Sequence, residues 1–585
     1  MKDRPKIAAP FIQALPGILQ YQLLTNVVIG LWLFLMGKVF RFLLHSAGRV
    51  AISTGDFTFL FTNWQGILII LTMIVSLFVY LALDLNAKII LSNDLLTGDP
   101  VRVWSILKRA LPTITKFINI RGLIVILYVA LIAPLLGFGL SLSVTERLYI
   151  PTFIASVIAD TPLYLAAVTL LCLLFISIGI ANLFILHGVV LDGLSLKEAG
   201  KQSGKLIRAN WKDYLIQNVL FILIMAFFLL AVLVLFLVLP LILVEFLPLS
   251  EELRRILTVF FTASGLFLSY VANLFVNPLY LMKMTQLYHC YKQDEQIAFH
   301  MWKQRKHGLT ILGIAVWLIV SLALSFVMVR SFDTLFPLES SVQIIAHRGG
   351  GTEGPENTVA GIEKAWEAGA YGSEIDIQRT KDGHYVINHD NNFKRVAGDK
   401  RKPSQMTLEE VKKLSVGGEP VPTLEEALLA AKGRGVLFIE LKGDTADRQM
   451  ADDAVKIVRE LGMEQESVMI SLKYDLIDYL ERTYPEIETG YLTFASFGDT
   501  ALLNCDYLAL EEESATAGTI SDIHDQGKKV LVWTANEKDS QKEFLCSKVD
   551  GIITDQVKQA ADIAEEMKER TDLERIVDTI VALIK

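Results

Sequence analysis

Cysteine is scarce in this chain of 585 residues, and its spacing argues against one class of site. The four cysteines form no CxxC pair, so the sequence suggests no zinc site. Excess positive charge is also missing: the formal net charge is −8, whereas a dedicated nucleic-acid binder needs a basic face. We expect no cleavable signal peptide, because the apolar stretch after MKDRPK lacks a small-residue cleavage site. Cys505 and Cys546 could still pair if the C-terminal part lies outside the cytoplasm.

Long apolar runs are abundant, and they fill the first 330 residues. The hydrophobic content is 52% and the mean hydropathy is +0.43, both above the averages of soluble proteins. A membrane-spanning helix needs about 20 predominantly apolar residues. Seven stretches meet this requirement: 17–37, 65–85, 122–143, 162–187, 214–244, 257–281 and 309–329. The fifth is long for one helix and short for two, and Pro240 near its end suggests a single long, tilted or kinked span.

Lysine and arginine in short loops mark the cytoplasmic side of a membrane protein. Basic segments follow the second, fourth and sixth apolar stretches, and the alternating loops carry fewer positive charges. This pattern predicts a multi-pass protein of the cell membrane with seven spans, a cytoplasmic N-terminus and an extracytoplasmic C-terminal domain. Lys38 and Arg41 are exceptions, because they would lie on the outer side.

The role of the membrane half is left open by its sequence. Charged residues inside the spans would indicate a transport pathway, and almost none is present. The basic segments, such as VRVWSILKRALPTITKFI, are either amphipathic helices on anionic lipid or solvated loops. A plain anchor in the lipid bilayer is favoured over a transporter.

From Ser341 onward, short apolar runs alternate with helical stretches. Strands are predicted at QIIAH, SEIDI, VLFIEL, SVMIS, CDYLAL, KVLVWT and GIIT. This alternation predicts a parallel sheet with crossover helices, as in an α/β (β/α)8 TIM barrel, with a doubly wound open sheet as the alternative. No GxGxxG or GxxxxGK[ST] loop follows the first strand, so nucleotide binding has no support. We therefore expect an all-α polytopic membrane domain at 1–330, a linker at 331–341, the barrel at 342–560 and a C-terminal amphipathic helix at 561–585.

Acidic side chains occur at the predicted C-terminal ends of two strands, where barrel enzymes carry their chemistry. Residues i and i+2 of a strand face the same side, so Glu374 projects with Asp376, and Glu440 projects with Lys442. Three carboxylates at the mouth of one barrel would repel each other unless a cation joins them. Their oxygen atoms suit a hard divalent ion such as Ca²⁺ or Mg²⁺.

Histidines and further cations lie at neighbouring strand ends. His347 and His389 could serve as base and acid, and Arg348 with Lys442 could hold an anion. The residues alone therefore suggest metal-assisted cleavage of a phosphate ester.

Five motifs in sequence order resemble those of the glycerophosphodiester phosphodiesterase family. They are IIAHRGGGTEGPENT, GSEIDIQRTKDGHYVINHD, FIELK, VWT and DGIITD, and they extend over about residues 342–555. Each motif alone is weak, but the five in this order are specific. The resemblance includes the apolar first half, which is similar to that of membrane-anchored bacterial members. It implies a TIM barrel that hydrolyses glycerophosphodiesters to sn-glycerol 3-phosphate and an alcohol.

The resemblance also implies a role for each matching residue. It makes Glu374, Asp376 and Glu440 the metal ligands. It makes His347 and His389 the catalytic pair, and we expect His389 to be the acid and His347 the base or nucleophile. Arg348 and Lys442 would contact the phosphate, and Trp533 would lie beside the glycerol end of the substrate. Whether water or the glycerol hydroxyl attacks phosphorus stays open, as does the oligomeric state.

Two alternatives remain from the sequence. The segment after His389 and Asp390 is short, so the substrate pocket is expected to be open, and a lysophospholipase D-type reaction on lysophospholipids is plausible. Alternatively, the C-terminal half is an inactive binding module of a membrane sensor or transporter. Against this second alternative, every expected catalytic position is filled.

Overall fold

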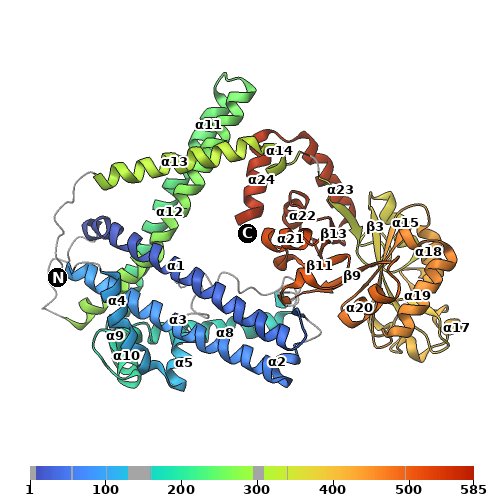
Figure 1. Cartoon of the computed structure of the whole chain (residues 1–585), viewed down its shortest axis with the longest axis horizontal. Coiled ribbons are helices and arrows are strands. Elements are labelled where there is room, and N and C mark those ends of the chain that lie inside the picture. The colour runs from blue at the N-terminus through green and yellow to red at the C-terminus, as the bar shows by residue number, and fades with distance from the viewer. Residues whose placement is uncertain are drawn as a thin grey trace. The chain divides into compact units, whose positions relative to one another are not determined.

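The computed structural model describes residues 8–53, 57–99, 102–128, 158–159, 161–293, 308–338, 340–494 and 496–584. The chain divides into two compact units, whose elements are labelled in Figure 1. One unit comprises Met1–Val39 and Leu68–Arg330. The other comprises Phe40–Ile67 and Ser331–Lys585, so it contains a short segment from the first part of the chain.

The first unit is helical in its described residues. Its main helices are α1 (Ala8–Ser46), α3 (Trp64–Thr97), α4 (Val103–Ala110), α5 (Ile120–Leu127), α8 (Pro162–Ala181), α9 (Ile185–Val190), α10 (Leu196–Leu233), α11 (Leu239–Phe246), α12 (Glu251–Lys292) and α13 (Gly308–Arg330). Among the described residues, six stretches are long and apolar enough to cross a membrane: Gly17–Ser46, Trp64–Thr97, Pro162–Val190, Leu196–Phe246, Glu251–Lys292 and Gly313–Arg330. They overlap six of the seven predicted spans. The remaining predicted span, at 122–143, begins in α5, and its greater part lies outside the described residues.

The long fifth apolar stretch forms one continuous helical segment, as expected. Helix α10 passes through a π-helical turn at Val234–Val238 into α11, near whose start Pro240 lies. Proline has no backbone N–H, and its ring clashes with the carbonyl of the residue four positions earlier. A local π turn accommodates this defect without ending the helix. The basic segment before this span is the start of α10, capped by Ser195 and Glu198, and is therefore helix and not loop.

The second unit contains a closed barrel of parallel strands. In spatial order they are β2 (Gln343–Ala346), β3 (Gly372–Arg379), β7 (Val436–Leu441), β8 (Ser467–Ser471), β9 (Glu488–Thr493), β11 (Tyr507–Glu511), β12 (Lys529–Trp533) and β13 (Gly551–Thr554). Because β13 pairs with β2 and β2 pairs with β3, the sheet closes on itself. The expected TIM barrel is thus confirmed, and the open doubly wound sheet is excluded.

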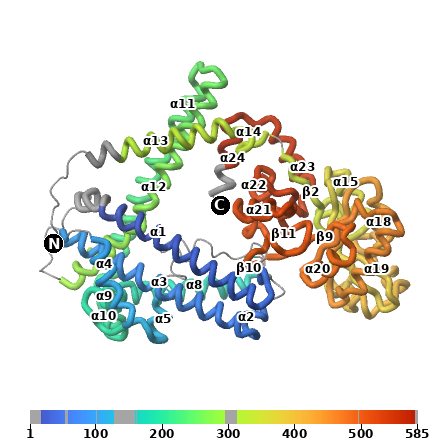
Figure 2. Tube along the Cα trace, viewed as in Figure 1, coloured from blue at the N-terminus to red at the C-terminus, as the bar shows by residue number. Residues whose placement is uncertain are grey.

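Helices follow the strands and cover the barrel. They are α15 (Val359–Glu367), α18 (Leu424–Ala431), α19 (Arg448–Leu461), α20 (Tyr474–Thr483), α21 (Ala517–His524), α22 (Lys538–Leu545) and α23 (Val557–Glu566). Figure 2 follows the chain through this alternation from β2 to α23. A final helix, α24 (Asp572–Ile584), lies within the C-terminal segment for which an amphipathic helix was expected.

One barrel strand, β9, is absent from the seven that the sequence predicts. Its residues, ETGYLT, mix polar and apolar types and so give no apolar run. Gly490 in this strand is required by close packing, because a Cβ there would lie 2.8 Å from Cγ2 of Ile470 and 3.2 Å from Cβ of Tyr507. The strand is buried on both faces, but threonine and glycine interrupt its apolar residues, so the burial does not show as an apolar pattern.

Several short elements lie outside the eight parallel strands of the barrel. Strand β4 (Tyr385–Ile387) runs antiparallel to β3, so His389 follows a hairpin strand and not a barrel strand. Helix α16 (Lys394–Ala397) comes next in the chain. Strand β10 (Ser496–Gly498) pairs antiparallel with β1 (Ala51–Ser53). None of the four cysteines forms a disulfide, so Cys505 and Cys546, both buried, are not paired with each other.

Candidate active site

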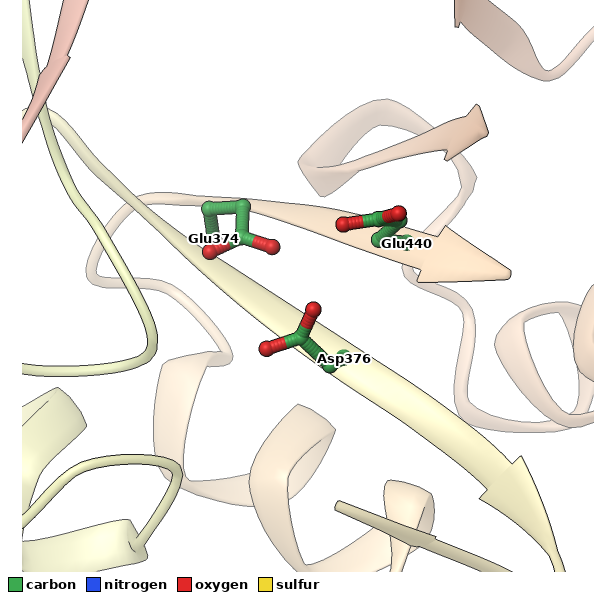
Figure 3. Close-up of side chains that lie close together, drawn as sticks. All are labelled: Glu374, Asp376 and Glu440. Carbon is green, nitrogen blue, oxygen red and sulfur yellow. The ribbon is translucent and has the colours of Figure 1, made fainter. Parts of the chain in front are cut away.

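Three carboxylates converge at the mouth of the barrel. Glu374 and Asp376 come from β3 and Glu440 from β7, and Asp376 lies opposite Glu440 in the pairing of these strands. All three side chains are buried, with at most 5% of each residue exposed. One oxygen of each carboxylate lies within 4.8 Å of the others, and Figure 3 shows the three groups pointing toward one another. The expectation that alternate strand residues face the same side is met.

Burial of these like charges shifts their proton affinities. Burial and the charges of Asp376 and Glu440 raise the pKa of Glu374 well above its ordinary value. Burial likewise raises the pKa of Glu440, to about 7. Burial would also raise the pKa of Asp376, but the charge and hydrogen bond of Lys442, together with His389 and Asn357, hold that pKa below the ordinary value. When all three carboxylates are ionised they outnumber the one lysine, so a divalent cation fits the cluster by charge and by donor type.

Lys442 is the cation that the structure places in this cluster. Its Nζ donates to Asp376 Oδ1 at 2.9 Å and to Glu440 Oε2 at 2.8 Å. These carboxylates raise the pKa of Lys442 although burial lowers it. Lys442 therefore remains charged, and its described partners are the carboxylates.

Asn357 is a supporting residue whose contact could not be read from the sequence. Its Nδ2 donates to Asp376 Oδ2 at 2.8 Å, and its backbone has φ of 54°, in the left-handed region. Asparagine tolerates this conformation better than most residues. The amide thus orients Asp376 from the opposite side to Lys442.

His347 is held by a carboxylate at the end of the last barrel strand. Its Nδ1 lies 2.8 Å from Asp555 Oδ1, and Asn536 Nδ2 donates to Asp555 Oδ2 at 2.6 Å. Burial raises the pKa of Asp555, but the bonds from His347 and Asn536 bring it below the ordinary value. Asp555 is therefore ionised. It fixes the ring of His347 through Nδ1 and does not contact Nε2.

His389 has a similar arrangement on the other side. Its Nδ1 lies 2.9 Å from Asp390 Oδ1, and its Nε2 lies 3.1 Å from Arg348 Nη2. Since arginine only donates, Nε2 is the acceptor and Nδ1 carries the proton toward Asp390. Burial, together with the charges of Lys442 and Arg348, lowers the pKa of His389. The ring is thus neutral in the ligand-free site.

A short network of charges fixes Asp390. Arg395, on α16, donates from Nε to Asp390 Oδ2 at 2.8 Å and from Nη2 to Glu356 Oε1 at 2.7 Å. The Arg395 guanidinium holds the pKa of Asp390 at about 2. Neither Arg395 nor Asn536 was predicted, because nothing in its local sequence distinguishes it from a surface residue.

The loop after β2 brings Arg348 to the cluster. The backbone N–H of Arg348 donates to Glu374 Oε2 at 2.8 Å, and its φ is 49°. Gly351 in this loop has φ of 58°, and a Cβ there would lie 2.3 Å from the carbonyl oxygen of Asp555. The glycines of the HRGGG motif therefore allow the loop to pass close to the last strand.

Trp533 ends β12 and is partly buried against the inner apolar cluster of the barrel. Its Nε1 donates to the carbonyl oxygen of Ala509 at 3.0 Å. The indole N–H is therefore used within the protein, which leaves the ring face as the part suited to contact a ligand.

Comparisons with known proteins identify the family to which both halves of the chain are similar. Residues 347–559 match the model of the glycerophosphoryl diester phosphodiesterase family, and residues 6–326 match that of the membrane domain of glycerophosphoryl diester phosphodiesterase. A glycerophosphodiester phosphodiesterase of Caldanaerobacter subterraneus is 30% identical over 231 residues, which cover 36% of this chain and 93% of that protein. One from Bacillus altitudinis is 28% identical, covering 39% and 99%. The crystal structure of one from Parabacteroides distasonis is 28% identical, covers 39% and 98%, and gives a TM-score of 0.36.

These two matches show that the protein is a membrane protein with a C-terminal TIM-barrel domain of the phosphodiester hydrolase class. The chain belongs to the glycerophosphoryl diester phosphodiesterase family. The family predicted from the motifs is therefore confirmed.

Proposed function

We propose that this protein hydrolyses glycerophosphodiesters to sn-glycerol 3-phosphate and an alcohol with a divalent metal ion held by Glu374, Asp376 and Glu440. The observation that carries the proposal is the convergence of three buried carboxylates at the barrel rim that also carries two histidines, each paired with its own aspartate. An all-oxygen donor set favours Ca²⁺ or Mg²⁺. When bound, such an ion stabilises negative charge on the phosphoryl oxygens.

His389 is the proposed acid. In the ligand-free site its Nε2 accepts a hydrogen bond from Arg348, and its ring is neutral. An arriving phosphate gives Arg348 a stronger partner and adds negative charge near the ring. Both changes favour the imidazolium, which then donates its Nε2 proton to the departing alcohol.

His347 is the proposed base or nucleophile. Asp555 accepts a bond from its Nδ1, which orients the ring and stabilises the imidazolium after proton transfer. Arg348 and Lys442 are the proposed phosphate contacts, and the ring face of Trp533 is the proposed contact of the glycerol end. To contact the phosphate, the ammonium group of Lys442 must donate hydrogen bonds to the phosphate as well as to Asp376 and Glu440.

We further propose the predicted topology for the whole chain. The three basic segments support a cytoplasmic N-terminus, seven spans in residues 1–330, and an extracytoplasmic catalytic domain joined by a linker at 331–341. Such a domain would meet substrates derived from membrane lipids outside the cytoplasm.

The test uses the full-length protein in detergent. Release of glycerol 3-phosphate from glycerophosphocholine and glycerophosphoethanolamine is measured with Ca²⁺, with Mg²⁺ and with chelator. We expect release with metal, none with chelator, and at least a hundredfold loss in Asp376→Asn. Release that persists in chelator, or in Asp376→Asn, would contradict the proposal.

A further inference from the structure

The loop between the first two predicted spans is part of the barrel's unit. Strand β1 in this loop pairs antiparallel with β10, with Ala51 opposite Gly498 and Ser53 opposite Ser496. Beyond the strand, the N–H of Asp499 donates to the carbonyl oxygen of Val50 at 3.0 Å. The backbone of the loop thus extends a small sheet on the barrel.

Side chains strengthen this pairing. Arg41 Nε lies 3.3 Å from Asp499 Oδ1, and His45 Nε2 lies 3.9 Å from Asp499 Oδ2. Ala51 belongs to the main apolar cluster of the barrel, and Ile52 is only 1% exposed. The loop therefore contributes buried apolar surface and an ion pair, and not only backbone hydrogen bonds.

The rim to which the loop is paired is the catalytic rim. Strand β10 follows β9, so it lies at the C-terminal ends of the barrel strands, the same end that carries the carboxylates and histidines. The loop itself is joined to membrane-spanning candidates on both sides. Ala51 is five residues from Ser46, where the first candidate ends, and five extended residues reach at most about 18 Å. Trp64, which is 65% exposed, begins the second candidate.

We propose that Phe40–Ile67 is a docking element that ties the catalytic rim to the membrane, so that the site serves phosphodiesters held in the bilayer surface. This substrate class rests on the function proposed above, whereas the docking itself does not. The reaction is unchanged: the bond from phosphorus to the alcohol oxygen breaks, water supplies the new oxygen on phosphorus, and the alcohol leaves with a proton. The docking also explains the positive charge of Arg41 on the outer side, because Asp499 is its partner.

The pairing also constrains the number of membrane crossings. Among the described residues, five candidate spans lie between β1 and the barrel. Five crossings would place β1 and β10 on opposite sides of the membrane, where they could not pair. An even number is required, and the seven spans predicted from the sequence meet this requirement, because six of them follow β1 in the chain. The pairing therefore favours seven spans in total.

The docking is tested by cross-linking in the full-length protein. Ser53→Cys and Ser496→Cys are combined, because these positions are register partners, and the linked peptides are sought by mass spectrometry after mild oxidation in intact membranes. The matched control combines Ser53→Cys with Lys548→Cys, which lies before β13 at the other end of the barrel. We expect the first pair to link and the control not to. No link in the first pair, or equal links in both, would overturn the docking.

The substrate class is tested with one headgroup in two settings. Full-length protein in lipid nanodiscs is assayed for choline release from free glycerophosphocholine and from lysophosphatidylcholine held in the same bilayer. Asp499→Arg should lower the rate on the bilayer substrate by about fivefold or more, leave that on the free substrate unchanged, and be rescued by Arg41→Asp. The control, Glu460→Arg, reverses an exposed charge on α19 and should change neither rate.

The outcomes separate the two proposals. Equal loss on both substrates, or no loss on either, would overturn the role in substrate choice. No choline release by the wild-type protein from either substrate would contradict the proposed function, and the cross-link would still report on the docking.

Discussion

Replacing Lys442 by methionine tests how the acidic cluster is stabilised. The lysine Nζ donates to Asp376 and Glu440, and its side chain is 19% exposed. Removing one partner of a buried charge pair costs about 3–5 kcal/mol, because the other charges stay buried without compensation. For a domain of this size, about 1 kcal/mol corresponds to a change of about 2–4 °C in Tm. In chelator, Lys442→Met should therefore lower the Tm of the barrel by about 10 °C.

A bound divalent ion should reduce this cost, because it supplies positive charge to the same carboxylates. The Tm is measured for the full-length protein in detergent, with chelator and with saturating Ca²⁺ or Mg²⁺. The control is Lys456→Met, which removes an exposed lysine whose nearest carboxylate is 3.8 Å away and should shift the Tm by about 1 °C or less. Equal, small shifts for Lys442→Met in chelator and in metal would refute this account of the cluster.

Two further predictions concern titration and proton transfer. Because burial and neighbouring charges hold the pKa of Glu440 at about 7, above 4.5, the metal-free folded protein binds a proton that the unfolded chain has lost. Glu440 should therefore lower the free energy of unfolding by about 3 kcal/mol as the pH rises from 4.5 to 7, and the raised pKa of Glu374 should add to this fall. Denaturant titrations in chelator should show that Glu440→Gln removes the part of the fall that Glu440 contributes. His389→Ala should lose about a hundredfold or more in kcat on glycerophosphocholine but little on a p-nitrophenyl diester, whose leaving group needs no acid, whereas His347→Ala should lose both; equal losses in His389→Ala would contradict its role.

The convergence of the three carboxylates could be predicted because it depends on strand geometry. Parallel strands end at the same edge of a barrel, so Glu374, Asp376 and Glu440 follow from two apolar runs and a period of two. His347 was found by the same reasoning. His389 was found although it follows a hairpin strand and not a barrel strand, because the motif around it was specific.

Other features depend on contacts between distant segments and leave no periodic signal. Asn357 reaches Asp376 only because its backbone adopts a left-handed conformation. Arg395 donates to Asp390, and Asn536 donates to Asp555. These two aspartates are the ones that contact the histidines, and neither donor lies in the motif of its histidine. The pairing of β1 with β10 joins residues more than 400 positions apart, and neither strand is longer than three residues. Such contacts form only in the folded protein and cannot be predicted from the local sequence.

The most direct test of the account measures metal binding and activity together. Full-length protein is stripped with chelator, and Ca²⁺ or Mg²⁺ is added back while bound metal and glycerol 3-phosphate release are followed in parallel. We predict that activity returns in step with the binding of metal at a single site per chain, and that Glu374→Gln and Asp376→Asn lose both. Activity that is complete before any metal binds, or metal binding that survives both substitutions, would contradict the claim that these carboxylates hold the catalytic ion.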